Sequence, residues 1–192
     1  MVQKIRLIIL TGFILLLAAC SDTIDYMVLG AGTPKGNEIA ISDISFDNNS
    51  WGAIGGITSC CWGYATGRNG VRNRPAPKTA YLEWYDYDQK IRYSGTMQLS
   101  DKLYDYATDL PNYRVIHSGR VERNPHPYFI FGFGENGEVV AWISNAATDR
   151  NKEGRVMHEV GRIQAEVLTN PSEASGSPKE DTATDTRSVS AE

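Results

Sequence analysis

Two apolar runs decide the fold of this chain: YFIFGF at residues 128–133 and VVAWIS at residues 139–144, joined by GENGE at residues 134–138. Aromatic and β-branched side chains dominate both runs, which is typical of strands. Asn136-Gly137 lies between them, and this pair favours the left-handed backbone of a tight hairpin turn. The sequence therefore predicts an antiparallel hairpin over residues 128–144.

Similar short runs, bounded by turn residues, occur on the N-terminal side of this hairpin. Ile39-Ala40-Ile41 and Ile44-Ser45-Phe46 precede the turn-forming stretch DNNS, which predicts one strand, or two strands joined by a kink. Residues 78–84 and 91–99 flank a polar segment and predict a second hairpin. One more strand is expected within residues 115–121, before the proline pair of NPHP interrupts regular pairing.

Helical spacing occurs twice. Residues 100–110 predict a short helix that begins at Ser100 and is ended by Pro111. Residues 151–168 predict a longer amphipathic helix, because apolar side chains recur there at intervals of three and four: Val156, Val160, Ile163 and Val167. The expected fold class is thus α+β, a mostly antiparallel sheet or sandwich of short strands with one C-terminal amphipathic helix.

The N-terminus has the pattern of a bacterial lipoprotein signal. Lys4 and Arg6 precede an apolar stretch that ends in LLAAC, with small residues directly before Cys20. Cleavage before Cys20 predicts a cysteine carrying fatty acyl chains such as palmitate, and several chains give stable membrane anchoring. Because Ser21 stands where an aspartate favours inner-membrane retention, we expect a lipoprotein of the outer membrane that faces the periplasm.

The signal and the composition divide the chain into four parts. Residues 1–19 are the expected signal peptide, 20–38 a lipidated and partly flexible tether, 39–169 a globular domain, and 170–192 a disordered tail almost without large apolar residues. The formal net charge is −4, and basic side chains are scattered among acidic ones. This distribution disfavours a nucleic-acid partner.

Cys60-Cys61 is the most unusual local feature. In an oxidising compartment the adjacent thiols could be two buried hydrophobic side chains, a vicinal disulfide, or a redox or metal site. The first interpretation is favoured, because free cysteines are often buried. The three histidines show no ligand spacing with the pair, so no metal is expected: His117, His126 and His158.

Catalytic motifs are not apparent. His158-Glu159 begins like a zinc protease motif, but Arg162 stands where the second histidine is needed. No nucleophile elbow of the form Gly-x-Ser-x-Gly occurs, and Gly132-Phe133-Gly134 lies inside a predicted hairpin rather than before a helix. We therefore expect a protein that is not an enzyme and that uses no cofactor.

Binding is the alternative that the aromatic residues favour. The segment EWYDYD at residues 83–88 is either an amphipathic strand entering a polar turn or an exposed aromatic loop that binds a protein. The segment RNGVRNR at residues 68–74 is interpreted as a basic loop, solvated or facing an acidic partner or lipid headgroups. The candidate partner-binding residues are Trp51, Arg72, Trp84, Tyr85 and Tyr87.

The chain resembles small Gram-negative lipoproteins of uncharacterised-domain families. The resemblance rests on the lipoprotein signal, the strand running into Ser50-Trp51-Gly52, the glycine-rich approach to Cys60-Cys61 and the strand of residues 80–84. Some members of those families resemble immunity proteins encoded beside type VI secretion lipase effectors. The resemblance covers residues 41–99 and is interrupted after Cys61, where Trp62-Gly63-Tyr64 and the basic segment replace a shorter apolar segment.

This resemblance implies stoichiometric binding of a secreted lipase-type toxin at the membrane. The alternative function is a structural or assembly lipoprotein of the envelope, or a module that binds a small ligand.

Overall fold

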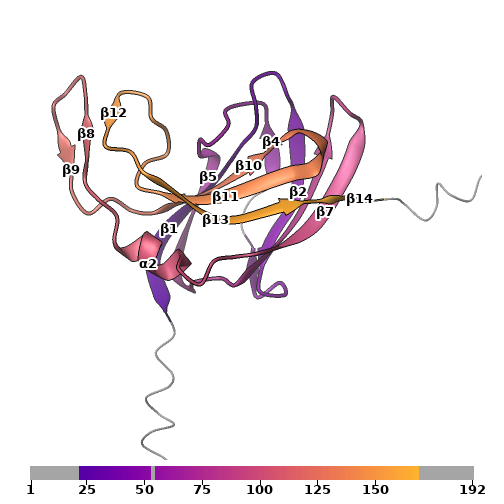
Figure 1. Cartoon of the computed structure of the whole chain (residues 1–192), viewed down its shortest axis with the longest axis horizontal. Coiled ribbons are helices and arrows are strands. Elements are labelled where there is room, and N and C mark those ends of the chain that lie inside the picture. The colour runs from indigo at the N-terminus through magenta and orange to yellow at the C-terminus, as the bar shows by residue number, and fades with distance from the viewer. Residues whose placement is uncertain (1–21, 53–54, 169–192) are drawn as a thin grey trace, which may run out of the picture.

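Two β-sheets packed face to face form the body of the molecule in the computed structural model, which describes residues 22–52 and 55–168 (Figure 1). The first sheet has the strand order β13-β11-β10-β1-β5, and its strands are β1 (Thr23–Gly32), β5 (Thr66–Pro75), β10 (Tyr128–Phe133), β11 (Glu138–Ser144) and β13 (Met157–Gln164). Within it β1 and β10 run parallel, and the other pairs are antiparallel.

The second sheet has the order β14-β7-β6-β2-β3, with β4 also paired to β2. Its strands are β2 (Ile39–Phe46), β3 (Trp51–Gly52), β4 (Gly56–Thr58), β6 (Thr79–Asp86), β7 (Ile91–Gln98) and β14 (Glu166–Val167). Of the two alternatives predicted for residues 39–46, the structure shows a single strand, β2, whose pairing with β6 shifts register between Ile41 and Asp43. The predicted 78–99 hairpin is confirmed as β6 and β7.

Aromatic side chains fill the space between the two sheets. Phe46 of β2 lies 5.7 Å from Phe129 and 6.1 Å from Phe131 of β10, measured between ring centroids. Trp84 of β6 contacts Phe133 edge to face, at 4.9 Å. All five side chains have 0% relative exposure, so this interlayer region is the hydrophobic core.

The predicted 128–144 hairpin is confirmed, with Phe133 opposite Val139 and a 3-10 turn, η1 (Glu135–Gly137), between the strands. Asn136 and Gly137 have φ angles of 55° and 84°, the left-handed conformation that this pair favours. A Cβ at Gly137 would come within 2.9 Å of the Tyr93 ring. The turn therefore requires glycine for its packing as well as its backbone.

The predicted C-terminal amphipathic helix is wrong, and with it the α+β fold class: among the described residues the fold is nearly all β. Residues 157–164 form β13, paired with β11, and the register shifts between Ala141 and Trp142. The extra residue there is Val160, which lets Val160 and Ile163 both contact the core although they are an odd number of positions, three, apart in the strand. This bulge produces the spacing that the sequence shares with a helix.

One short helix is confirmed, α2 (Leu103–Thr108), which buries Leu103 and Ala107 at the end of the sandwich near the start of β1 (Figure 1). A small third sheet projects from the body, with the order β12-β8-β9 and the strands β8 (Tyr113–Val115), β9 (Val121–Glu122) and β12 (Lys152–Glu153). The single strand expected over 115–121 is therefore a hairpin. No helix among the described residues is long and apolar enough to cross a membrane.

Two other expectations differ from the structure. The proposed tether, residues 20–38, contains β1, which pairs with strands on both sides and buries Met27 and Leu29 in the core. The predicted basic loop 68–74 belongs to β5, whose exposed arginines lie on an edge strand and discourage pairing with another chain. The signal peptide 1–19, the acylation site Cys20 and the tail 170–192 lie outside the described residues.

Candidate functional site

A short connection between β4 and β5, residues 59–65, covers part of the outer face of the first sheet. Cys60 and Cys61 form a disulfide with an S–S distance of 2.01 Å, so the vicinal bridge is the interpretation that the structure shows. The Cys60 carbonyl oxygen accepts hydrogen bonds from the hydroxyls of Thr58, at 2.9 Å, and Thr66, at 3.1 Å. These contacts join the disulfide to the strands on either side of it.

Two glycines of β1 allow the connection to lie directly on the sheet. A Cβ at Gly30 would be 2.4 Å from the Cβ of Ala65, and one at Gly32 would be 2.2 Å from the Cys61 carbonyl oxygen. Beneath the connection a second, smaller apolar cluster forms from Ala65, Ile130 and Ala147, with Tyr128 and Trp142 packed against it. Close backbone approach at Gly32 therefore fixes where the disulfide segment sits.

Replacing Gly32 by alanine is expected to lower the free energy of unfolding by about 1–3 kcal/mol, because the new methyl group meets backbone atoms that cannot rotate away. Urea unfolding of the two proteins measures this difference. Gly55→Ala is the matched control, since a Cβ there meets only the Ile41 carbonyl oxygen, at 3.6 Å. Equal stability of the Gly32 variant and the wild type would contradict the close approach of residues 59–65 to Gly32 of β1.

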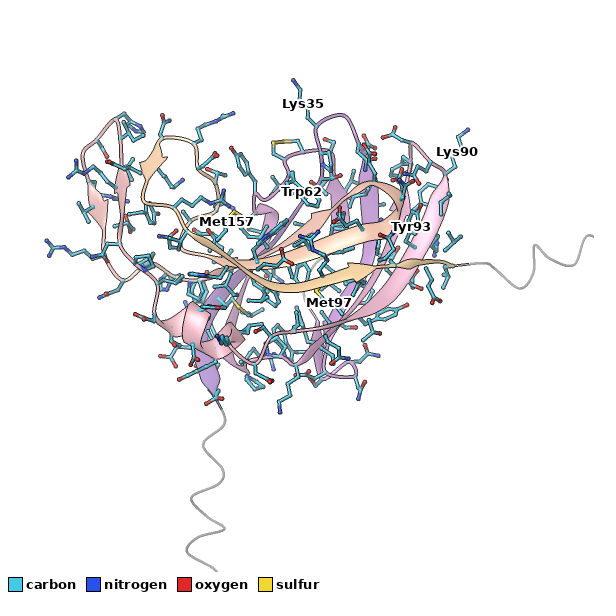
Figure 2. The ribbon with its side chains drawn as sticks, in the orientation of Figure 1. Lys35, Trp62, Lys90, Tyr93, Met97 and Met157 are labelled. Atoms are coloured by element: carbon cyan, nitrogen blue, oxygen red, sulfur yellow. A yellow bond between two sulfur atoms is a disulfide. The ribbon has the colours of Figure 1, made fainter. Side chains whose placement is uncertain are left out.

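Trp62 follows the disulfide and lies on this outer face with 38% relative exposure (Figure 2). Its ring meets Trp142 of β11 edge to face, with 5.3 Å between centroids. Gly132 and Gly134 provide the space, because a Cβ at either position would come within 3.1 Å and 3.4 Å of the Trp62 ring. The indole therefore rests on glycine backbone while part of it faces solvent.

Arg155 holds the segment after Trp62 in place. Its guanidinium donates to the Gly63 carbonyl oxygen and, through Nε, to the Ala146 carbonyl oxygen at 3.2 Å. It also lies 5.5 Å from the centre of the Tyr64 ring, whose hydroxyl donates to Asp149. That hydrogen bond raises the pKa of Tyr64, with burial as the second cause, while burial lowers the pKa of Arg155.

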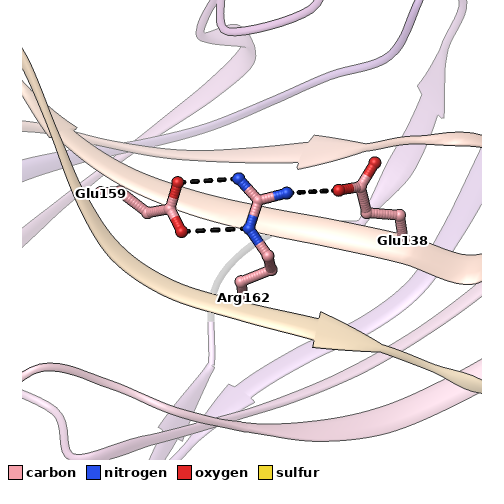
Figure 3. A network of polar contacts seen from close by, with 3 residues as sticks. All are labelled: Glu138, Glu159 and Arg162. Carbon is pink, nitrogen blue, oxygen red and sulfur yellow. Dashed lines mark hydrogen bonds and ion pairs between the residues drawn. The ribbon is translucent and has the colours of Figure 1, made fainter.

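Beside Trp142 the outer face carries an exposed charged network (Figure 3). Arg162 donates to both oxygens of Glu159, from Nη2 at 2.8 Å and from Nε at 3.1 Å, and pairs with Glu138 through Nη1. Glu159 is the cross-strand partner of Trp142, so the network borders the tryptophan pair. We call Trp62, Trp142, Glu138, Glu159 and Arg162 the Trp62 platform.

Replacing Arg162 by glutamine is expected to raise the pKa of the Glu159 carboxyl group, because the guanidinium hydrogen bonds hold that pKa below its ordinary value. A lowered pKa in the folded state adds stability above the ordinary carboxyl pKa, and this stability is lost as the pH falls through the folded value. Because Glu159 is 46% exposed, the effect on unfolding is small, and the pKa itself is the better readout.

An NMR titration of the glutamate side chains measures this pKa in both proteins. Arg114→Gln is the control, since Arg114 pairs with Glu153 in the small third sheet. An unchanged Glu159 titration in the Arg162 variant would contradict the network.

Comparison with protein families places the whole sandwich in one family. The model described as "Protein of unknown function (DUF2931)" matches residues 23–191. The chain belongs to the DUF2931 family. The match begins at Thr23, the first residue of β1, in agreement with the structural role of that strand. No curated protein and no solved structure matches the chain.

Two of the predicted partner-binding residues of this DUF2931 chain are core residues instead. Trp51 has 6% exposure and stacks on Phe46 at 4.1 Å, and Trp84 has 0% exposure and stacks on Tyr93 at 5.3 Å. The alternation along β6 explains the second case, because Trp84 faces the other sheet while Tyr85 faces outward.

The other three predicted residues lie at the surface, and two of them are in contact. Tyr85 and Tyr87 contact each other at 5.1 Å on the outer side of the second sheet. Arg72 lies on β5 of the first sheet, 5.1 Å from the centre of the Tyr26 ring. Of the predicted binding surface, therefore, only Tyr85 and Tyr87 form a contiguous patch.

Trp62, the most exposed tryptophan of the DUF2931 domain among the described residues, was missed as a candidate. Two signals pointed to it: its place directly after Cys61, and the glycines of GFG at 132–134 that provide its seat. Trp62 and Gly132 are 70 positions apart, and only the sheet topology shows that they lie together. Within the described residues no group of three or more His, Cys, Asp and Glu side chains could hold a metal ion.

Proposed function

We propose that this DUF2931 chain is a lipid-anchored protein of the bacterial cell envelope that acts by binding another protein, and that its partner is a type VI secretion toxin of the lipase class. The Trp62 platform is the observation that carries the binding function. Tryptophan and arginine are the residue types that most often dominate the energy of protein interfaces.

The platform suits binding because its parts are already ordered. Trp62 rests on the backbone at Gly132 and Gly134, Arg155 fixes the adjacent segment, and the disulfide joins this segment to Thr58 and Thr66. A rigid anchor loses little conformational entropy when a partner covers it. The bidentate contact of Arg162 likewise presents a charged group in one orientation beside the rings.

The location and the class of partner rest on the sequence. The LLAAC signal with Ser21 supports acylation of Cys20 and residence at the outer membrane, facing the periplasm. The resemblance over residues 41–99 supports a toxin of the lipase class as the partner. An immunity protein at this position meets an incoming toxin before it reaches phospholipid.

Competition between cells tests the proposal. A strain of the source organism that lacks this chain is exposed to kin that deliver the neighbouring effector, and is complemented with the wild type, with Cys20→Ser or with Trp62→Ala. We expect the wild type to restore survival, and both variants to protect less. Equal survival with and without the chain would overturn the immunity function.

Affinity capture identifies the partner independently. The chain without residues 1–19 and with Cys20→Ser is used as bait, and mass spectrometry reads the bound proteins. A single lipase-like effector in near one-to-one amount supports the proposal. Recovery of envelope assembly components instead would indicate that the chain is a structural or assembly lipoprotein. Recovery of no protein with the bait would favour a module that binds a small ligand.

A further inference from the structure

The attachment point of the sandwich constrains its orientation on the membrane. Only Ser21 and Asp22 separate Cys20 from Thr23, where β1 begins. From Asp22 onward the chain is held along the end of β5, because the Asp22 carbonyl oxygen accepts a hydrogen bond from the Ala76 backbone at 2.8 Å and Thr23 pairs with Pro75. An acyl anchor on Cys20 therefore acts on a rigid element with almost no slack.

We propose that the end of the sandwich around Asp22 is a membrane-facing surface that rests on phospholipid headgroups, and that the Trp62 platform is held at the opposite, aqueous end. This inference rests on the proposed acylation of Cys20. We call the two ends the proximal and distal ends.

The chemistry of the proximal end fits headgroups rather than acyl chains. This end has a hollow of about 380 Å³, lined by Asp22, residues 75–78, the turn before α2 and the first residues of α2. The charged side chains in its lining are those of Asp22, Lys78 and Asp101. Large apolar side chains that are exposed among the described residues lie elsewhere: Ile57, Trp62, Tyr87, Ile116, Val121, Val167 and Leu168. A polar surface that has none of the exposed large apolar side chains suits contact with headgroups rather than insertion among acyl chains.

The distal end is defined by the other end of β1. This strand has 10 residues, so Gly32 lies about 30 Å from Thr23 at the usual rise per residue. Because β10 runs parallel to β1, Gly132 pairs with Gly32, and Trp62 lies against Gly132. Lys35 and Lys90 project from the side of the molecule away from α2 (Figure 2).

A second hollow, of about 320 Å³, opens at this distal end. It is lined by the loop of residues 34–37, by Asp88 and Gln89 of the β6–β7 turn, and by Glu135. The distal end thus carries a concave polar surface, beside the Trp62 platform on the outer face of the first sheet, and both lie far from the anchor.

Fluorescence quenching on vesicles tests this orientation. The full acylated chain is purified from membranes as Lys78→Cys or Lys35→Cys, labelled at the new thiol, and placed in phosphatidylethanolamine and phosphatidylglycerol vesicles that contain a headgroup-linked quencher. Cys60 and Cys61 are joined in a disulfide, so the introduced thiol is the one that reacts. We expect the label at position 78 to be quenched several-fold more than the label at position 35.

A spacer variant and mass spectrometry keep the two proposals distinguishable. About 12 Gly and Ser residues inserted between Ser21 and Asp22 add about 20 Å of flexible reach, and are expected to bring the two quenching values together. An acylated chain with equal quenching at both positions, or stronger quenching at position 35, overturns the orientation and leaves the anchoring intact. A chain without acyl groups on Cys20 overturns both.

Discussion

Replacing Phe46 by alanine is expected to lower the free energy of unfolding by about 3–5 kcal/mol, the usual cost of truncating a buried phenylalanine. Phe46 has 0% exposure and contacts Trp51, Phe129 and Phe131, so its loss leaves a cavity between the two sheets that neither sheet can close alone. A loss of this size is a large part of the 5–15 kcal/mol by which most domains are stable.

Guanidinium unfolding of the Cys20→Ser chain without residues 1–19 measures this change. The matched control is Tyr87→Ala, an aromatic side chain with 43% exposure on the outside of the second sheet, whose loss is expected to change stability by about 0.5 kcal/mol or less. A Phe46 variant as stable as the Tyr87 variant would contradict the position of Phe46 between the sheets.

Replacing Trp62 by alanine is expected to weaken binding of the captured partner by at least about 2 kcal/mol, which is about 30-fold in Kd. The removed ring supplies the exposed anchor of the platform, and Trp142 behind it is left without its edge-to-face contact. Isothermal titration with the purified partner measures the affinity. The same variant is expected to protect cells poorly in the competition experiment.

Tyr87→Ala is the control for this prediction as well, because the two side chains have similar exposure, 38% and 43%, on the outer faces of different sheets. If the Tyr87 variant keeps its affinity and the Trp62 variant keeps its thermal unfolding temperature, the loss of affinity in the Trp62 variant comes from the platform. The reverse result, weak binding by Tyr87→Ala and normal binding by Trp62→Ala, would move the binding surface to the tyrosine pair that the sequence predicted.

The success of the sequence-based predictions follows the range of the interactions involved. The hairpin around Asn136-Gly137 was predictable, because its turn geometry and its strands depend on neighbouring residues. The helix α2 was predictable for the same reason. The strand β13 was mistaken for a helix, because a bulge at Val160 reproduces the helical spacing of apolar residues.

The candidate site shows the same division at the level of side chains. That Trp51 and Trp84 face the core could not be read from their residue type, since tryptophan is common both in cores and at interfaces. The Trp62 platform brings together the connection after β4 and residues of β11 and β13, and Trp62 rests on the glycines at positions 132 and 134. Its parts are separated by up to 100 positions in the chain.

The sequence alone determined the local features of this protein: the predominance of short strands, the turns rich in asparagine and glycine, and the predicted acylation signal before Cys20. Tertiary structure alone decided that β1 is a central strand, that β13 continues into β14 of the other sheet, and that Trp62 lies on Trp142. The physical reason is that a strand obtains its hydrogen bonds and its buried face from segments distant in sequence, whereas a turn or a short helix is stabilised largely by its own residues.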